Sequence, residues 1–328
     1  MHNHKGRWLP LLGCLLAQPL VAAAAEPLYS KNLSPVAGLL GLPSLRATEL
    51  AAPGSWQFAV HAGIASHFVV DSNSGEAVNL DGETWRLAFD FRYGFAEHWE
   101  LQLDVPVLSH DGGSLDSLID GWHDLWGMPD GGRKAVESDR LDYRYASAAG
   151  GFALRDASGG IGDVSVILNR ALYRDGSWQL SAGAGYKFAS GREGDFLGSG
   201  AEDAFAVLRA ARAAPGSRLS WQGQAGYLRA GRSDLLGSAQ ERDLWFAGVG
   251  VGWAWLDSLS LLLQVDSHSP PLDSSLTALG GTALLLTAGA RWRFSEDWAL
   301  DLGFAEDIRV ETAPDVTFQA SLRYRPGR

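Results

Sequence analysis

The sequence predicts an all-β protein, a single-chain transmembrane antiparallel β-barrel of about 12 strands, and three observations lead to this fold class. Many segments alternate between apolar and polar side chains, as strands do when one face meets lipid and the other a polar interior. Short and long connections alternate along the chain. Tryptophans follow several of the short ones, where an aromatic girdle at the membrane boundary would lie.

The first element, residues 1–25, has the order of a secretory signal peptide. Two basic residues precede an apolar run, and an Ala-x-Ala sequence stands directly before Glu26. We therefore expect cleavage after Ala25 and export to the cell outer membrane. Cys14 is the single cysteine of the chain and suggests lipid acylation, but the apolar run continues past it. After the expected cleavage no disulfide can form.

The next element, residues 26–54, reads "EPLYSKNLSPVAGLLGLPSLRATELAAPG" and has no periodicity. It is rich in leucine and proline. Two interpretations stay open, a plug within the barrel lumen and an ordered tail in the periplasm.

The barrel domain, residues 55–328, contains the alternating segments. They cover residues 55–68, 84–95, 98–108, 161–174, 177–190, 201–214, 218–230, 242–256, 258–268, 281–294, 298–308 and 315–325. The long connections include 69–83, 109–160, 190–201, 230–241 and 269–280. An even number of strands places both termini on the periplasmic side. The pattern leaves open which faces of 161–174, 201–214 and 242–256 turn inward, and it predicts a further strand near 141–147 above the membrane.

The polar faces of these strands supply the candidates for lumen-lining or binding residues. They are Arg86, Asp90, Arg92, Glu100, Asp104, Lys187, Arg291, Asp301 and Arg323. Counting back from the short turns places Arg92 opposite Glu100 and Arg291 opposite Asp301, and opposite charges across a strand pair attract. A mixed-charge lining indicates either a solute pathway, as in small hydrophilic porins, or a closed polar core without transport.

The stretch "SHDGGSLDSLIDGWHDLWGMPDGGR", residues 109–133, predicts one helix at about 115–126 inside the long loop 109–160. Its apolar residues recur at helical spacing, and aspartates occupy the opposite side. We interpret the helix as a constriction within the lumen, a lid across its mouth, or a Ca²⁺ site. The aspartates lack the spacing of a calcium loop, so no metal is assigned. The candidate residues are His110, Asp111, Asp116, Asp120, Trp122, His123, Asp124 and Trp126.

Composition excludes several classes of protein. The chain carries a formal net charge of −11 and few lysines, which argues against nucleic acid as a partner. No stretch after the signal has about 20 uninterrupted apolar residues, so a helical membrane protein is not expected. No Gly-x-Ser-x-Gly sequence occurs. A lipid-hydrolysing enzyme stays a weaker alternative in which His123 or His268 would approach a loop serine, and no catalytic residue or cofactor is predicted.

The 109–133 stretch, with "SPVAGLLGLPSL", "GGIGDVSV" and "GSGAED", resembles a family of Gram-negative outer-membrane proteins, domain-of-unknown-function family 3187. The resemblance covers most of the chain after the signal and implies an outer-membrane β-barrel. It implies no substrate and no catalytic residues. We therefore expect a channel or binding barrel for a small solute, or alternatively a structural or receptor barrel. Its expected partners are outer-membrane lipids and lipopolysaccharide, the barrel assembly machinery and a small-molecule solute.

Overall fold

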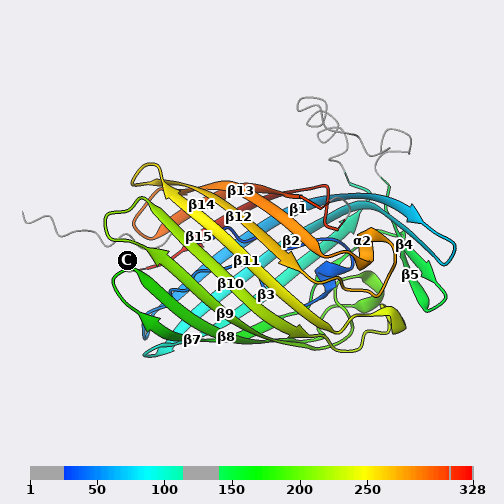
Figure 1. Cartoon of the computed structure of the whole chain (residues 1–328), viewed down its shortest axis with the longest axis horizontal. Helices are drawn as coiled ribbons and strands as arrows, with labels where there is room; N and C mark the ends of the chain where they lie inside the picture. The colour runs from blue at the N-terminus through cyan, green and yellow to red at the C-terminus, as the bar shows by residue number, and fades with distance from the viewer. Residues whose placement is uncertain (1–25, 114–139, 310–311, 327–328) are drawn as a thin grey trace, which may run out of the picture.

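The computed structural model describes residues 26–113, 140–309 and 312–326. Twelve long strands form one closed antiparallel barrel (Figure 1). They are β1 (Trp56–Ser72), β2 (Glu76–Ala96), β3 (Trp99–Asp111), β7 (Ser165–Arg174), β8 (Trp178–Lys187), β9 (Asp203–Ala213), β10 (Leu219–Arg229), β11 (Asp243–Ala254), β12 (Leu259–His268), β13 (Ala283–Arg293), β14 (Trp298–Asp307) and β15 (Val316–Tyr324). The predicted fold class is confirmed, and each of the 12 predicted segments overlaps one of these strands.

Pairing between β1 and β15 closes the barrel, from Phe58 opposite Tyr324 to Ser66 opposite Val316. Each of the other long strands pairs with the next long strand along the chain. β3 pairs with β7 in this way, because the three short strands β4, β5 and β6 come between them in sequence. Closure satisfies the backbone groups of every strand, which a lipid environment requires. We call the two ends of the barrel the short-turn end and the loop end. The described C-terminus lies at the short-turn end (Figure 1).

Three shorter strands, β4 (Asp142–Ser147), β5 (Gly150–Leu154) and β6 (Ser158–Ile161), extend the sheet at the loop end. β4 matches the strand predicted near 141–147. The prediction of a long connection over 69–83 was wrong, because β1 and β2 continue as a paired hairpin to Ser72 opposite Ala77. The Asn73 side chain accepts hydrogen bonds from the backbone N–H groups of Gly75 and Glu76, which stabilises a tight turn.

Helices are short in the described part of the chain: η1 (Ala37–Leu39), η3 (Glu193–Asp195), η4 (Gly237–Ala239) and α2 (Thr277–Gly280). Among the described residues, no helix has the length and apolar character needed to cross a membrane. The helix predicted at 115–126 lies outside the described residues.

The outer surface of the barrel is apolar and carries aromatic residues near both ends. Exposed aromatic side chains at the short-turn end are Trp56, Tyr93, Phe95, Trp178, Trp221, Trp253, Trp255, Trp292, Phe294 and Trp298. Those at the loop end are Tyr186, Phe188, Tyr227 and Trp245. Aromatic rings favour the boundary between lipid and water because one part of the ring system is apolar and another polar. The two belts therefore mark the expected membrane boundaries.

The N-terminal segment, residues 26–54, lies inside the barrel (blue in Figure 1). It begins beside Arg92 near the short-turn end and passes Asp203 near the loop end at Gly41. It then returns, so that Pro53 forms a bridge with Gly94 next to the start of β1. The segment thus runs the length of the interior twice.

The loop half of the interior is closed by an apolar cluster. Its members come from the N-terminal segment, the strands and the loops, and they include Val36, Leu39, Leu40, Leu42, Val69, Leu80, Tyr143, Phe152, Phe196, Phe205, Val207, Leu244, Phe246, Leu272, Leu276 and Leu279. Phe205 and Leu244 establish which faces of β9 and β11 turn inward. Those strands are apolar on both faces because one face meets lipid and the other meets this cluster.

Candidate functional site: the occupied barrel interior

The nine predicted lumen-lining residues all face the interior and are buried there. Each of these residues is at most 8% exposed. Most belong to the short-turn half and the middle of the barrel, where they contact the N-terminal segment. Lys187 belongs to a separate group near the loop end. The interior is therefore polar and charged in its short-turn half and mainly apolar in its loop half.

Glu26 binds a group of arginines at the short-turn end. Its carboxylate accepts from Arg92 at 2.9 Å and lies 3.0 Å from Arg323, and Arg325 also donates to it. Asp301, opposite Arg291 in the register as predicted, joins Arg291 and Arg323 into the same network. Hydrogen-bonded carboxylate–guanidinium pairs are strong when they are buried and fully satisfied. The first residue of the segment is therefore held by the wall.

Arg46 makes the corresponding contact on the returning part of the segment. It donates to Glu100 at 2.7 Å and also to Gln102. The prediction that Arg92 lies opposite Glu100 was wrong, because Gly94 takes that position and Arg92 lies opposite Gln102. A bulge between Gly94 and Ala96 adds a residue to β2 and shifts the register. Glu100 is thereby free to bind Arg46.

Tyr29 lies at mid-height between the segment and the wall. Its hydroxyl donates to Asp104 at 2.9 Å and accepts from Arg86 at 2.6 Å, and Arg86 also binds Asp104 at 2.8 Å. Its ring stacks on His61 of β1. The polar groups of Tyr29, Arg86 and Asp104 satisfy one another's hydrogen bonds. The ring stack with His61 and the Arg86–Asp104 ion pair together hold the segment against the wall.

Lys187 occupies a polar site near the loop end. Its ammonium group binds Asp163 and donates to Ser199 at 2.8 Å, and Asp203 lies 3.5 Å away. Asp203 accepts from the backbone N–H of Gly41 at 2.8 Å. The turn of the N-terminal segment is thus fixed to β9 by one main-chain hydrogen bond.

His67 of β1 and His110 of β3 meet at the side chain of Thr84 of β2. The Thr84 hydroxyl lies 3.2 Å from His67 Nε2 and 3.0 Å from His110 Nδ1, while His110 Nε2 lies 3.0 Å from the backbone oxygen of Phe196. All of these side chains are buried, and we interpret the link as structural. Sequence reasoning missed Thr84, although it shares the inward parity of Arg86.

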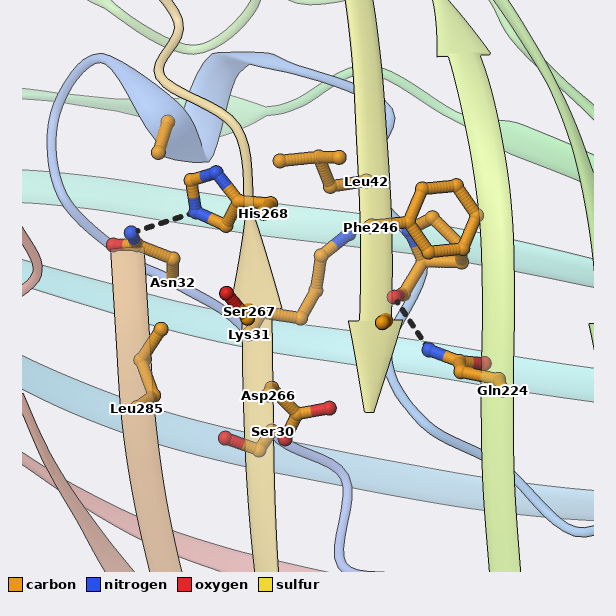
Figure 2. Close-up of a pocket in the computed structure, with 13 residues that line it drawn as sticks. Ser30, Lys31, Asn32, Leu42, Gln224, Phe246, Asp266, Ser267, His268 and Leu285 are labelled. Atoms are coloured by element: carbon orange, nitrogen blue, oxygen red, sulfur yellow. Dashed lines mark hydrogen bonds between the residues drawn. The ribbon is translucent and has the colours of Figure 1, made fainter. Parts of the chain in front are cut away.

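Small cavities lie between the N-terminal segment and the wall. One, shown in Figure 2, is lined by Lys31, Gln224, Asp266 and His268 among others and measures about 40 Å³. The second lies between Tyr29 and Gln319 and measures about 20 Å³. A single water needs roughly 10–15 Å³ of such space. The first cavity therefore accommodates about three water molecules and the second about one, and neither accommodates a solute.

Of the predicted loop residues, His110 and Asp111 lie at the end of β3. Asp116, Asp120, Trp122, His123, Asp124 and Trp126 lie outside the described residues. No group of three or more histidine, cysteine, aspartate or glutamate side chains is arranged to hold a metal within 26–113, 140–309 and 312–326. The contacts of Glu26, Tyr29 and Arg46 were not predicted, since the segment that carries them has no periodicity to indicate facing.

A family model described as "Protein of unknown function (DUF3187)" matches residues 11–326. Among solved structures, the chain is similar to the COG4313 outer membrane channel from Pseudomonas putida F1, with 14% identity and a TM-score of 0.52 over 84% of this chain and 96% of that one. It is also similar to the NanC porin, with 10% identity and a TM-score of 0.48 over 82% and 99%. The first likeness shows the fold of an outer-membrane barrel. The search of curated proteins found no match.

Proposed function

We propose that this chain, which belongs to the DUF3187 family of proteins of unknown function, is an outer-membrane channel for a small solute and that its N-terminal segment (residues 26–54) closes the lumen. The loop over 109–133 caps or constricts the same lumen from outside. The barrel spans the membrane, and the segment is the part that moves.

The way the segment is held supports this proposal. Within the described residues, the backbone of 26–52 forms no strand ladder with the wall, and side chains such as Glu26, Tyr29 and Arg46 hold it there instead. Its backbone joins the sheet at the bridge from Pro53 to Gly94. These side-chain contacts can break while every hydrogen bond between the strands of the closed sheet stays in place. A segment held in this way can leave while the barrel stays intact.

The character of the wall also favours a solute pathway over a permanently packed core. Barrels of eight strands fill their interior with their own side chains, and 12 strands enclose more space. Here a separate segment fills that additional space. Once it leaves, the exposed surface carries both signs of charge, including Arg86, Asp104, Arg291 and Asp301. Such a surface suits a small hydrophilic solute.

A reversible crosslink between the segment and the wall tests the proposal. A Cβ atom added at Gly41 would lie 3.3 Å from the Asp203 Cβ, close to the roughly 3.5–4.5 Å of disulfides. The cysteine pair Gly41→Cys/Asp203→Cys therefore locks the segment when oxidised. The one native cysteine, Cys14, lies in the expected signal peptide. The measurement is single-channel conductance of the refolded protein in planar bilayers, before and after addition of a reductant.

We expect the locked protein to be silent and the reduced protein to open in discrete steps. The single variants Gly41→Cys and Asp203→Cys serve as controls that do not respond to reductant. Equal conductance in the locked and reduced states would show that the segment is not the closing element.

Two observations favour the alternative of a structural barrel without transport, namely the water-sized cavities and the apolar cluster at the loop end. That alternative predicts silence from the wild type and from every variant, while heat-modifiable migration on a gel shows that each is folded. Such a result would overturn the channel proposal.

A further inference from the structure

Two arginines lie on the lipid-facing surface of the barrel at the short-turn end. Arg170 of β7 is directly opposite Trp99 of β3 in the register, and Arg212 of β9 is directly opposite Trp178 of β8. Directly opposite residues share one face of a sheet. Trp178 belongs to the aromatic belt, and Trp99 lies beside its member Phe95, with ring centroids 6.4 Å apart. Both arginines are exposed, so they lie at the expected membrane boundary.

A tryptophan ring holds each guanidinium group in place. The Arg170 Cζ atom lies 5.1 Å from the centroid of the Trp99 ring, and the Arg212 Cζ atom lies 5.4 Å from that of the Trp178 ring. Trp221 of β10 is directly opposite Arg212 on its other side. A cation within about 6 Å of an indole face is attracted by the electrons of the ring. Each arginine therefore has a preferred position within the belt.

Neither guanidinium group has an acceptor within the protein. Among the described residues, the side chains of Arg170 and Arg212 form no hydrogen bond and no ion pair. The acidic residues of the adjoining turns have other contacts, since Glu97 lies 3.5 Å from His98 and Asp175 accepts from backbone N–H groups. A guanidinium group carries several N–H donors, and the contact with a ring face leaves them unused. These donors are therefore available to an acceptor outside the protein.

The loop-end belt treats an outward-facing arginine differently. There Arg229 and Tyr227 of β10 both donate to the side chain of Asp243 on β11. Asp243 is directly opposite Arg229 in the register, so its carboxylate neutralises the charge of the guanidinium group. For Arg170 and Arg212 the corresponding anion is absent from the described part of the chain.

The headgroup layer of a bilayer supplies an anion at this depth. The phosphate of a glycerophospholipid lies between the acyl chains and water, which is the zone that an aromatic belt occupies. Guanidinium groups bind phosphate oxygens through paired N–H donors. Leu168 and Leu208, which precede the arginines on the same faces of β7 and β9, are exposed toward the membrane centre. The surface beside each arginine thus matches both the charged and the apolar part of a phospholipid.

We propose that Arg170 and Arg212 each bind the phosphate of a glycerophospholipid in the leaflet at the short-turn end. The guanidinium N–H groups donate to the phosphate oxygens, and the acyl chains of the same lipid pack against Leu168 and Leu208. The tryptophan beside each arginine positions the guanidinium group for this contact. Both sites face the membrane, so they do not depend on whether the barrel conducts a solute.

The number of lipids that stay bound to the protein tests the proposal. Native mass spectrometry of the refolded full chain, in detergent that contains phosphatidylglycerol, should show retained lipid. Arg170→Gln and Arg212→Gln should each retain fewer lipids, and the double variant should retain the fewest. Arg229→Gln, which alters the paired arginine of the loop-end belt, should retain as many as the wild type. Equal retention by the wild type and the double variant would overturn the proposal.

Unfolding in vesicles separates a bound phosphate from a general effect of the bilayer. The vesicles contain either phosphatidylglycerol or digalactosyldiacylglycerol, which has no phosphate, with the same acyl chains. The wild type should unfold at a temperature a few degrees higher in phosphatidylglycerol, because a ligand stabilises the state that binds it. Arg170→Gln/Arg212→Gln should lose this difference, as followed by heat-modifiable migration on a gel. A difference of the same size in the double variant contradicts the two sites.

Inorganic phosphate distinguishes a lipid headgroup from the free ion. Added to the glycolipid vesicles at matched ionic strength, it should leave the unfolding temperature of the wild type unchanged, because the free ion lacks the acyl chains that hold a headgroup at the boundary. A rise to the phosphatidylglycerol value, absent from the double variant, would assign the sites to free phosphate and overturn the lipid proposal.

Discussion

The phenol ring of Tyr29 lies flat on the imidazole ring of His61, with ring centroids 3.9 Å apart and 6° between the planes. Tyr29 belongs to the N-terminal segment and His61 to β1, so the stack joins the contents of the barrel to its wall. The same phenol bonds to Arg86 and Asp104. Packing and hydrogen bonding at one residue are therefore separable by substitution.

Tyr29→Phe keeps the stack and loses the hydroxyl, whereas Tyr29→Ala loses both. We expect Tyr29→Ala to weaken the docking of the segment by about 3 kcal/mol, as large-to-small substitutions of buried aromatic residues do, and Tyr29→Phe to weaken it by about 1 kcal/mol. The measurement is the rate at which a protease cleaves within 26–54 in the folded barrel. Equal protection of both variants and the wild type would contradict a docking role for Tyr29.

Glu26→Gln leaves Arg92, Arg323 and Arg325 without the carboxylate that they share. We expect the docking of the segment to weaken by about 3 kcal/mol or more, because removing one partner leaves buried charges uncompensated. The readout is the open probability in planar bilayers, which should rise. Glu49→Gln, in the same segment but paired with the exposed Arg174, is the control and should change little.

Gly94→Ala tests the passage of the segment over β2. A Cβ at this position would lie 2.3 Å from the Ala52 backbone oxygen and 2.4 Å from that of Ala51. We expect a lower yield of folded barrel, measured by heat-modifiable migration, since backbone atoms must shift. Gly176→Ala, where nothing lies within 4 Å, should fold as the wild type does. Normal folding of Gly94→Ala would show that the backbone of Ala51 and Ala52 does not pass this close to Gly94.

Asp175 provides a pH-dependent contribution from a short turn. Hydrogen bonds from the backbone N–H groups of Trp178 and Ser177, and from the Tyr173 hydroxyl, lower the pKa of Asp175 to about 2. Its ordinary value is about 3.9. Because the folded pKa is the lower one, the stabilisation is fully present above about pH 4 and is lost as the pH falls through about 2.

Asp175→Asn should therefore be less stable than the wild type above about pH 5, and the difference in unfolding temperature should shrink between about pH 4 and pH 2. A difference that stays constant over that range would show that the charge of the carboxylate does not contribute.

Replacing residues 111–132 with a short Gly/Ser link tests the loop proposed to cap or constrict the lumen. We expect larger conductance steps than in the wild type, recorded in planar bilayers. Unchanged steps would mean that the N-terminal segment alone closes the pathway.

The alternation of side chains predicted most of the fold, and the exceptions have local physical causes. Arg291 lies opposite Asp301 as the turn predicted, because the strands on both sides of that turn pair without a bulge. Arg92 does not lie opposite Glu100, because a bulge follows Gly94 and His98 takes a positive φ of 66°. A bulge depends on the packing around a turn, and periodicity does not report it.

The interior was harder to predict than the wall. Phe205 and Leu208 of β9 are both apolar, yet one faces the interior cluster and the other faces outward. Sequence alone does not distinguish an apolar side chain that faces lipid from one that packs against the apolar cluster inside the barrel. Arg209, which follows Leu208, was not predicted as an interior residue, because its strand has no clean alternation of apolar and polar side chains.

The place of the N-terminal segment in the chain has a consequence for biogenesis. The segment precedes every strand, and the barrel closes where β1, which follows it directly, pairs with β15. The N-terminal segment is thus synthesised before any strand of the barrel. Either β1 pairs with β15 around a segment that is already in place, or the segment enters the closed barrel afterwards from the short-turn end. If the segment is in place first, it acts as a template around which the strands assemble.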